Sequence, residues 1–264
     1  MRDPYATLTR HAWLQPDVWQ SLQERQRVMA RLFVELGWLD LSHRQALELG
    51  CGTGGNLLEL LRMGFMPSHL KGIEIDEHRH AHAREVLPSS LDLIHGDALG
   101  DEAQRVIAPL SQDLVLQATV FSSILDGALQ VHLADAMWHW VRPGGGVLWY
   151  DFTVDNPHNL KVRGVPVARV RQLFPQAHLH VRPVTLAPLV ARWACRRNPA
   201  LYHVFNALPW LRTHVLIWAT KPLDEPESTQ AGRVNKNEPA GTRPLSPFCP
   251  SRFQISAKMK SPKW

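Results

Sequence analysis

One acid and four glycines in residues 46–56 are the residues whose types and spacing could bind a ligand directly. The run reads Ala-Leu-Glu-Leu-Gly-Cys-Gly-Thr-Gly-Gly-Asn, an apolar strand followed by a glycine turn and the start of a helix. Glycine adopts backbone angles that a side chain forbids and lets the chain pass close to a ligand, while the helix start offers free N–H groups. The turn is therefore predicted to hold a nucleotide-like ligand.

The glycines alone leave two ligand classes open. Gly50, Gly52 and Gly55 have the G-x-G-x-x-G spacing of a dinucleotide-binding turn, which makes a nicotinamide cofactor one candidate. Glu48 argues against it, because a carboxylate two residues before the first glycine would repel a pyrophosphate and attract a cationic group. The structural alternative for Glu48 is a buried strand-end acid that caps a neighbouring helix.

The pattern E-x-G-x-G-x-G resembles the first motif of the class I S-adenosylmethionine-dependent methyltransferases. S-adenosylmethionine carries an ammonium and a sulfonium but no phosphate, which agrees with an acid at this place. The resemblance implies that Glu48, Gly50, Gly52 and Gly54 contact this cofactor. It covers residues 45–152 through several motifs and continues more loosely to the last predicted strand.

Further acids stand at the ends of the next two predicted strands. Residues 70–75 read as a short apolar strand, and Glu74 stands where a carboxylate can accept both ribose hydroxyls. Asp76 is instead expected to cap the following helix. The next Gly-Asp-Ala step resembles the family motif whose acid meets the adenine amino group, which implies Asp97 and Ala98 as adenine contacts. A simple turn is the alternative for Asp97.

The segment after the fourth predicted strand, 113–117, should line the methyl-transfer site, because open α/β sheets place their chemistry at the carboxyl ends of strands. The resemblance assigns Gln117, the last residue of this strand, to the cofactor site. Residues 118–123 lack the Asn/Asp-Pro-Pro-aromatic motif with which many methyltransferases of DNA bases or glutamine side chains hold an amino group. A small-molecule acceptor with an oxygen or nitrogen nucleophile is expected instead.

Candidate catalytic residues follow at the end of the fifth predicted strand. A hydroxyl acceptor requires a general base, and Asp151, His158 or Tyr150 could take its proton. A turn acid is the alternative for Asp151, and an exposed loop imidazole is the alternative for His158. Arg163 and Arg212 could bind a carboxylate or phosphate on the acceptor through paired N–H groups, or could be ordinary surface ion pairs.

Three functions stay in view at this point. The first is an S-adenosylmethionine-dependent methyltransferase, and the second is an NAD(P)-dependent oxidoreductase that uses the same glycine spacing. The third is a methyltransferase-like domain that binds the cofactor or a partner without catalysis, because no catalytic base is certain. No metal site is predicted.

Strands that alternate with helical runs indicate an α/β fold. We expect a three-layer sandwich around a seven-stranded, mostly parallel sheet with an antiparallel last strand, an N-terminal helix and a helical insertion between the last two strands. Residues 1–40 are predicted to form a helical cap, 41–221 the methyltransferase domain and 185–212 the insertion. The proline-rich residues 222–264 are predicted to be a disordered tail.

Two appended segments are expected to shape the acceptor site. The apolar periodicity of residues 16–37 predicts an amphipathic helix with Glu24, Arg25 and Arg27 on its exposed face. The long, apolar connection 185–212 is predicted to cover the acceptor or to pack as an extra helical layer.

Composition limits the partners and the compartment. The net charge is +5, and seven basic against four acidic residues from position 222 onward leave only +2 for the rest, so no nucleic acid is expected. The three cysteines show no disulfide or metal-ligand spacing, which fits a reducing cytoplasm. No signal-peptide core and no run of about 20 apolar residues is found, so no transmembrane segment is expected. Oligomeric state is not predicted.

Overall fold

The computed structural model describes residues 14–155, 159 and 161–223 of the 264-residue chain. All of these except Leu223 belong to one compact unit, Met1–Pro222. His158 and nearly all of the proposed tail therefore lie outside the described residues. The same holds for the first thirteen residues of the proposed cap.

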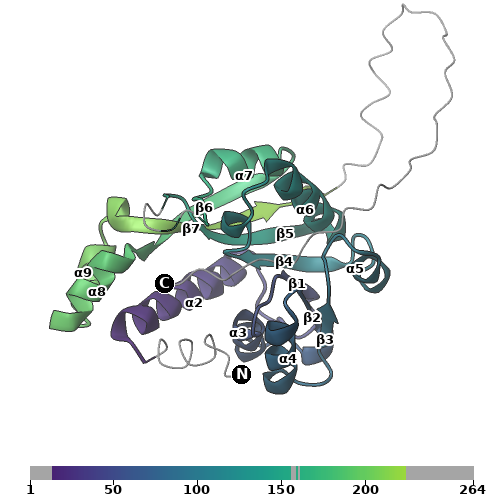
Figure 1. Ribbon diagram of the computed structural model, residues 1–264, viewed down its shortest axis with the longest axis horizontal. Coiled ribbons are helices and arrows are strands. Elements are labelled where there is room, and N and C mark those ends of the chain that lie inside the picture. Colours follow the sequence, from purple (N-terminus) through teal and green to yellow (C-terminus); the bar gives the residue numbers. More distant parts are fainter. Residues whose placement is uncertain (1–13, 156–158, 160, 224–264) are drawn as a thin grey trace, which may run out of the picture. The chain divides into compact units, whose positions relative to one another are not determined.

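A seven-stranded sheet forms the centre of this unit (Figure 1). In chain order the strands are β1 (Ala46–Leu49), β2 (Leu70–Glu74), β3 (Asp92–His95), β4 (Gln112–Ala118), β5 (Val141–Phe152), β6 (His178–Leu186) and β7 (Arg212–Thr220). Their order across the sheet is β3-β2-β1-β4-β5-β7-β6. The pairs among β1 to β5 are parallel, whereas β7 is antiparallel to both β5 and β6. The predicted sheet, with its antiparallel last strand, is confirmed.

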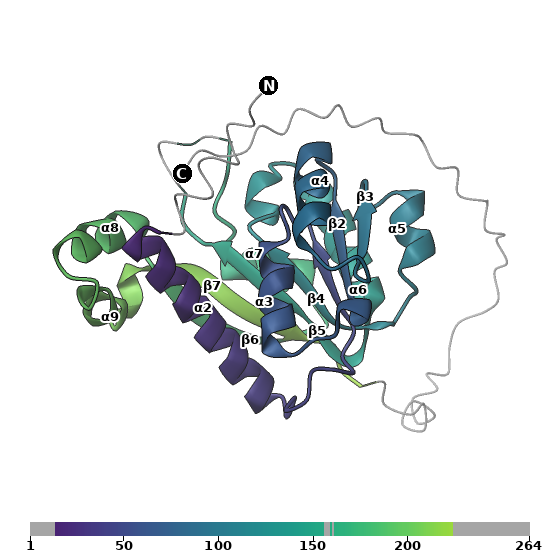
Figure 2. The same cartoon turned by 90° about the horizontal axis from the view of Figure 1, so that it is seen from below.

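Helices cover both faces of the sheet and complete the three layers (Figure 2). One face carries α2 (Pro16–Glu35), α3 (Gly55–Met63) and α4 (Glu77–Val86). The other face carries α5 (Asp101–Val106), α6 (Gly127–Trp140) and α7 (Val167–Leu173). Between β6 and β7 the chain forms α8 (Pro188–Arg197) and α9 (Leu201–Asn206), so the predicted N-terminal helix and helical insertion are confirmed as parts of the fold.

Short single turns connect several of these elements. They are η1 (Pro67–His69), η2 (Phe121–Ser123) and η3 (Pro209–Leu211). The predicted cap at Asp76 is present, because its carboxylate accepts the Arg79 N–H at 3.0 Å at the start of α4. β5 begins at Val141, because the chain pairs with β4 on both sides of a register shift.

The alternation of side chains in β1 explains how a polar group enters this core. All four residues of β1 are buried, with Leu47 and Leu49 in the apolar cluster on the α6 side of the sheet. Ala46 lies in the cluster on the α2 side, and Glu48 shares that face because successive strand residues point to opposite faces. Glu48 therefore places an ionisable group on the inner surface of the α2 side.

The exposed face predicted for α2 is partly wrong. Glu24 is 7% exposed, and the side chain of Arg25 is 11% exposed. Arg27 is exposed as expected. Glu24 is covered by β6 and α9, because it bonds to Thr185 and Asn206. Arg25 is covered by α3 and β5, because it contacts Glu59 and Tyr150. A single amphipathic stripe therefore underestimates the buried surface of α2.

Within the part of the chain that the structure describes, none of the helices combines the length and the apolar character needed to cross a membrane.

Candidate cofactor and active site

The glycine turn after β1 has the backbone that its sequence predicts. Gly50, Gly52 and Gly54 have φ angles of +65°, +57° and +86°, values that favour glycine. A Cβ on Gly50 would lie 2.6 Å from a methyl carbon of Val120, so a side chain there would clash with the segment after β4. A Cβ on Gly52 would meet no atom within 4 Å, which leaves open space where a ligand can approach the backbone.

Glu48 lies under this turn with one carboxylate oxygen free of protein partners. Its Oε1 accepts a hydrogen bond from Asn56 Nδ2 at 2.5 Å, at the start of α3. Its Oε2 is buried and has no hydrogen-bond partner among the described residues. Burial raises the pKa of Glu48 to about 8. A buried acceptor without a donor is costly, so a cationic donor placed beside Oε2 would be strongly favoured.

Glu74 fixes the turn from the end of β2. Its Oε2 accepts the Gly52 N–H at 2.7 Å, and its Oε1 accepts the Asp76 N–H at 2.8 Å. An ionised carboxylate has about four acceptor positions, so both oxygens keep capacity for ribose hydroxyls. The side chain is 3% exposed, and its assignment to ribose stays a prediction.

Asp97 and Ala98 lie next to the same group of loops. The Gly96 N–H donates to the Glu74 carbonyl at 3.0 Å, which ties the end of β3 to the end of β2. Asp97 is half-buried and its Oδ1 accepts the Leu99 N–H at 2.9 Å, as a turn-forming acid would. The assignment of Asp97 and Ala98 to adenine stays a prediction.

Gln117 and Asp151 lie inside the protein, where they hold the segment after β4. Both are fully buried on the α6 side of the sheet. Gln117 Oε1 accepts the Val120 N–H at 3.1 Å, and Asp151 Oδ2 accepts the Ser122 N–H at 3.1 Å. Burial raises the pKa of Asp151 to about 7, against the opposing effect of these hydrogen bonds. Both side chains therefore hold the segment after β4, and their predicted contacts with cofactor and acceptor stay predictions.

Thr119 is a feature that sequence analysis missed. It directly follows β4 and has a φ of +57°, a strained value for a β-branched residue. The conformation is held by its N–H, which donates to the Tyr150 carbonyl at 2.8 Å, and by its carbonyl, which accepts the Ser122 hydroxyl at 3.2 Å. Strain of this kind concentrates at functional sites. No residue type in the sequence signals it, since glycine is absent there.

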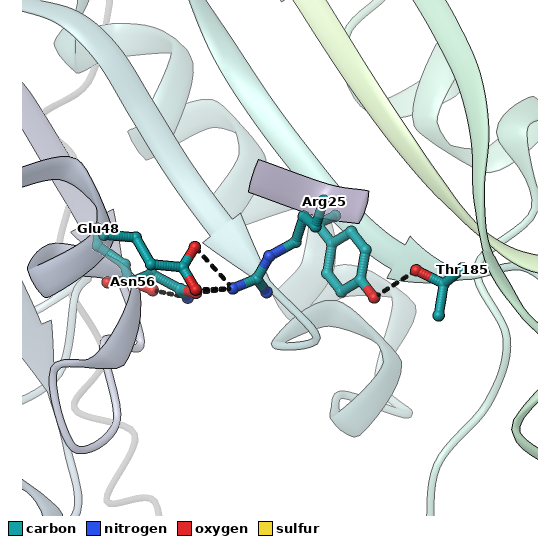
Figure 3. Close-up of polar contacts among 6 residues, drawn as sticks. Arg25, Glu48, Asn56 and Thr185 are labelled. Atoms are coloured by element: carbon teal, nitrogen blue, oxygen red, sulfur yellow. Dashed lines mark hydrogen bonds and ion pairs between the residues drawn. The ribbon is translucent and has the colours of Figure 1, made fainter. Parts of the chain in front are cut away.

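Arg25 of α2 enters the site from the cap, which the sequence also did not indicate (Figure 3). Its Nη2 donates to Asn56 Oδ1 at 2.6 Å and to both Glu59 oxygens at 3.0 Å. Asn56 thus connects Arg25 to Glu48. The guanidinium carbon lies 5.0 Å from the centre of the Tyr150 ring, a cation–π contact.

Tyr150 and the two candidate arginines lie in three different environments. The Tyr150 hydroxyl is bonded to Thr185 Oγ1 at 2.9 Å, and burial raises its pKa, so it is a poor base here. Arg163 has an exposed side chain, and its N–H donates to the Ser122 carbonyl at 2.8 Å, beside the segment after β4. Arg212 instead donates to carbonyls of residues in α9 and β6. The two arginines do not form one site.

A family model described as a methyltransferase domain matches residues 46–145. Among solved structures, the chain resembles a candidate sarcosine dimethylglycine methyltransferase from Galdieria sulphuraria at TM-score 0.57 and 14% identity, over 77% of this chain and 88% of that one. It resembles the [4+2]-cyclase SpnF at TM-score 0.54 and 14% identity, over 76% and 83% of the two chains. It also resembles an S-adenosylmethionine-dependent methyltransferase from Mesorhizobium loti at TM-score 0.51 and 14% identity, over 72% of this chain and 95% of that one. No curated protein matches the chain in sequence.

Residues 46–145 match the methyltransferase-domain model, and the strand order and the similar solved structures show the fold of the class I, Rossmann-like methyltransferases. The cofactor of this class is S-adenosylmethionine. The residues at the turn fit S-adenosylmethionine. The Glu48 oxygen without a partner suits the ammonium of this cofactor, and the open space at Gly52 admits a ligand against the backbone.

Proposed function

We propose that the chain is a methyltransferase that transfers the methyl group of S-adenosylmethionine to a small molecule through an oxygen or nitrogen nucleophile. The observation that carries the proposal is the buried Glu48 oxygen without a partner beside a glycine turn that is open at Gly52. A carboxylate in this place favours an ammonium and opposes a pyrophosphate, which argues against the oxidoreductase alternative.

The residues around the turn divide the work of binding. Glu48 is proposed to accept from the ammonium, Glu74 from the ribose hydroxyls, and Asp97 with Ala98 to border the adenine. When bound, the cofactor supplies a methyl group already activated on a sulfonium. The chain then needs to align the acceptor and exclude water, which is the task we assign to the buried supports of the segment after β4.

The acceptor is proposed to lie against residues 118–123, at the carboxyl end of β4. Arg163 adjoins this segment through its backbone and presents an exposed guanidinium, which suits a carboxylate or phosphate on the acceptor. Asp151 has no exposed surface and Tyr150 is bonded to Thr185, so neither is poised to take a proton. A neutral amine needs no base before it attacks, and this favours amine acceptors over hydroxyl acceptors in the present geometry.

Binding without methyl transfer is the second candidate function. The burial of Asp151 and Tyr150 favours it, since both were expected to act as bases. One structural neighbour is named as a cyclase, which supports the view that this fold carries other chemistry as well.

The test is a product assay on the full chain. S-adenosylmethionine is mixed with panels of small primary and secondary amines and hydroxyl compounds, each with and without a carboxylate, and S-adenosylhomocysteine is measured by mass spectrometry. We expect turnover that depends on the acceptor, with amines that carry a carboxylate among the best.

The test variant for this assay is Arg163→Gln, and its control is Arg171→Gln, at an exposed arginine on α7. Loss of turnover in the first alone supports Arg163 at the acceptor. Tight binding of S-adenosylhomocysteine with no turnover on any acceptor would favour the non-catalytic candidate.

A further inference from the structure

A cavity lies between α2 and β6, the edge strand of the sheet. Its volume is about 420 Å³, large enough for a small organic molecule. Its walls come from α2, β6 and the end of α9, together with the first residue of β7. β4, β5 and β7 separate β1 from β6 in the sheet, which places the two strands about 19 Å apart at the usual strand spacing of ~4.8 Å.

Four arginines give the cavity a positive wall. They are Arg27 and Arg31 of α2, Arg182 of β6 and Arg212 of β7. Arg182 is paired with Glu35, and Arg212 donates to two backbone carbonyls. Among the described residues, Arg27 and Arg31 have no hydrogen-bond or ion-pair partner and are exposed, so their N–H groups are free for a ligand.

The one acid in the cavity wall, Glu24, is already occupied. Its Oε2 accepts the Tyr202 hydroxyl at 2.7 Å and the Thr185 N–H at 3.1 Å, and its Oε1 accepts Asn206 Nδ2 at 2.7 Å. Asn206 also lines the cavity, and its buried Oδ1 has no partner in the described chain. The cavity therefore offers an acceptor in its wall together with guanidinium donors.

The charge of the surrounding segment favours the same class of ligand. Residues 156–223 contain ten Lys and Arg and no Asp or Glu, whereas residues 1–155 contain twelve Lys and Arg and twenty Asp and Glu. The net charge of +2 for residues 1–221 is the sum of a negative first part and a positive second part. A cavity bordered by a segment without acids attracts anions over longer range than its own wall alone.

We propose that this cavity binds a small organic anion, a carboxylate or a phosphate ester, with its charged group on Arg27 and Arg31 and a hydroxyl or amine donor toward Asn206. The site is separate from the proposed cofactor site and does not depend on the proposed function. Arg212, predicted from the sequence as an acceptor ligand, belongs to the wall of this second site.

Calorimetric titration of the full chain tests the proposal, with inorganic phosphate and succinate as separate probes at constant ionic strength. We expect at least one of them to bind with a stoichiometry of one. The double variant R27Q/R31Q should weaken that binding at least tenfold, as the loss of charged hydrogen bonds implies. Both substitutions are on exposed side chains, so the variant should fold normally, which its thermal midpoint checks.

The control is R62Q/R105Q, which removes the same charge from exposed positions on α3 and α5. It should change probe affinity less than twofold. Binding of succinate alone assigns the site to carboxylates and binding of phosphate alone to phosphates, and either supports the proposal. No binding of either probe at millimolar concentration, unchanged binding in R27Q/R31Q, or equal weakening in the control would overturn it.

Discussion

The cofactor region and the cap region are held together in different ways. In the cofactor region, made of β1 to β3 and the loops that follow them, polar bonds join residues close in sequence, such as Glu48 to Asn56 at a separation of eight residues. In the cap region, made of α2, α8, α9 and β6, Glu24 bonds to Thr185 and Tyr202 at separations of 161 and 178 residues. Short-range bonds follow from local motifs, and the long-range bonds depend on the finished fold.

The largest effect is expected where the two regions meet, at Arg25. Arg25→Met should lower the free energy of unfolding by about 3–5 kcal/mol, because Glu59, 3% exposed, would lose its charged partner. Chemical denaturation measures this. Arg27→Met, two residues along the same helix and exposed, is the matched control and should change stability by less than about 0.5 kcal/mol. Equal effects of the two substitutions would show that Arg25 does not join the regions.

The difference between Arg25 and Arg27 also shows what the sequence could reveal. The glycine turn and Glu48 were predictable, because both lie within one strand-turn-helix unit, and the mostly parallel sheet followed from the alternation of strands and helices. The environment of Arg25 was not, since its partners Glu59 of α3 and Tyr150 of β5 are distant in sequence and helical periodicity does not place them beside α2. The strain at Thr119 was hidden for a similar reason, because it results from contacts with β5.

A second prediction concerns the cofactor region itself. Glu74→Ala should lower affinity for S-adenosylhomocysteine tenfold or more, since a charged hydrogen bond is worth about 1.5–3 kcal/mol and Gly52 would also lose its acceptor. Titration calorimetry gives the value. Glu77→Ala, an exposed acid three residues later, should bind as the unmodified chain does. If Glu74→Ala binds S-adenosylhomocysteine with unchanged affinity, the assignment of Glu74 to the ribose is wrong.

A third prediction follows from the pKa of Glu48, which burial raises to about 8 from an ordinary value of 4.5. The unfolded chain releases this proton at lower pH than the folded chain does. The contribution of Glu48 to stability is therefore fully present below about pH 4.5 and is lost as the pH rises through 8.

Glu48→Gln isolates this contribution, because Asp151 also titrates with a raised pKa and is common to both proteins. Between pH 5 and 9 the unmodified chain should lose more stability than Glu48→Gln in denaturation experiments. Affinity for S-adenosylhomocysteine should rise with pH over the same range in the unmodified chain, because its ammonium favours ionised Glu48. Parallel pH profiles of the two proteins would contradict this.

The smallest effect is expected at Thr119. Thr119→Asn should stabilise the protein by about 0.5–1 kcal/mol, because asparagine adopts the positive φ of +57° at lower cost than a β-branched residue. Thermal denaturation detects a gain of this size. Thr53→Asn in the glycine turn, whose φ is not positive, is the control and should bring no gain. A clear loss of stability in Thr119→Asn would show that the threonine contacts outweigh the strain.

The most direct test of the central claim is a parallel calorimetric titration of the full chain with S-adenosylhomocysteine and NADH. The account predicts one site for S-adenosylhomocysteine and no binding of NADH, because the buried carboxylate of Glu48 favours an ammonium and opposes a pyrophosphate. Binding of NADH alone would contradict it and would make the glycine turn a dinucleotide site.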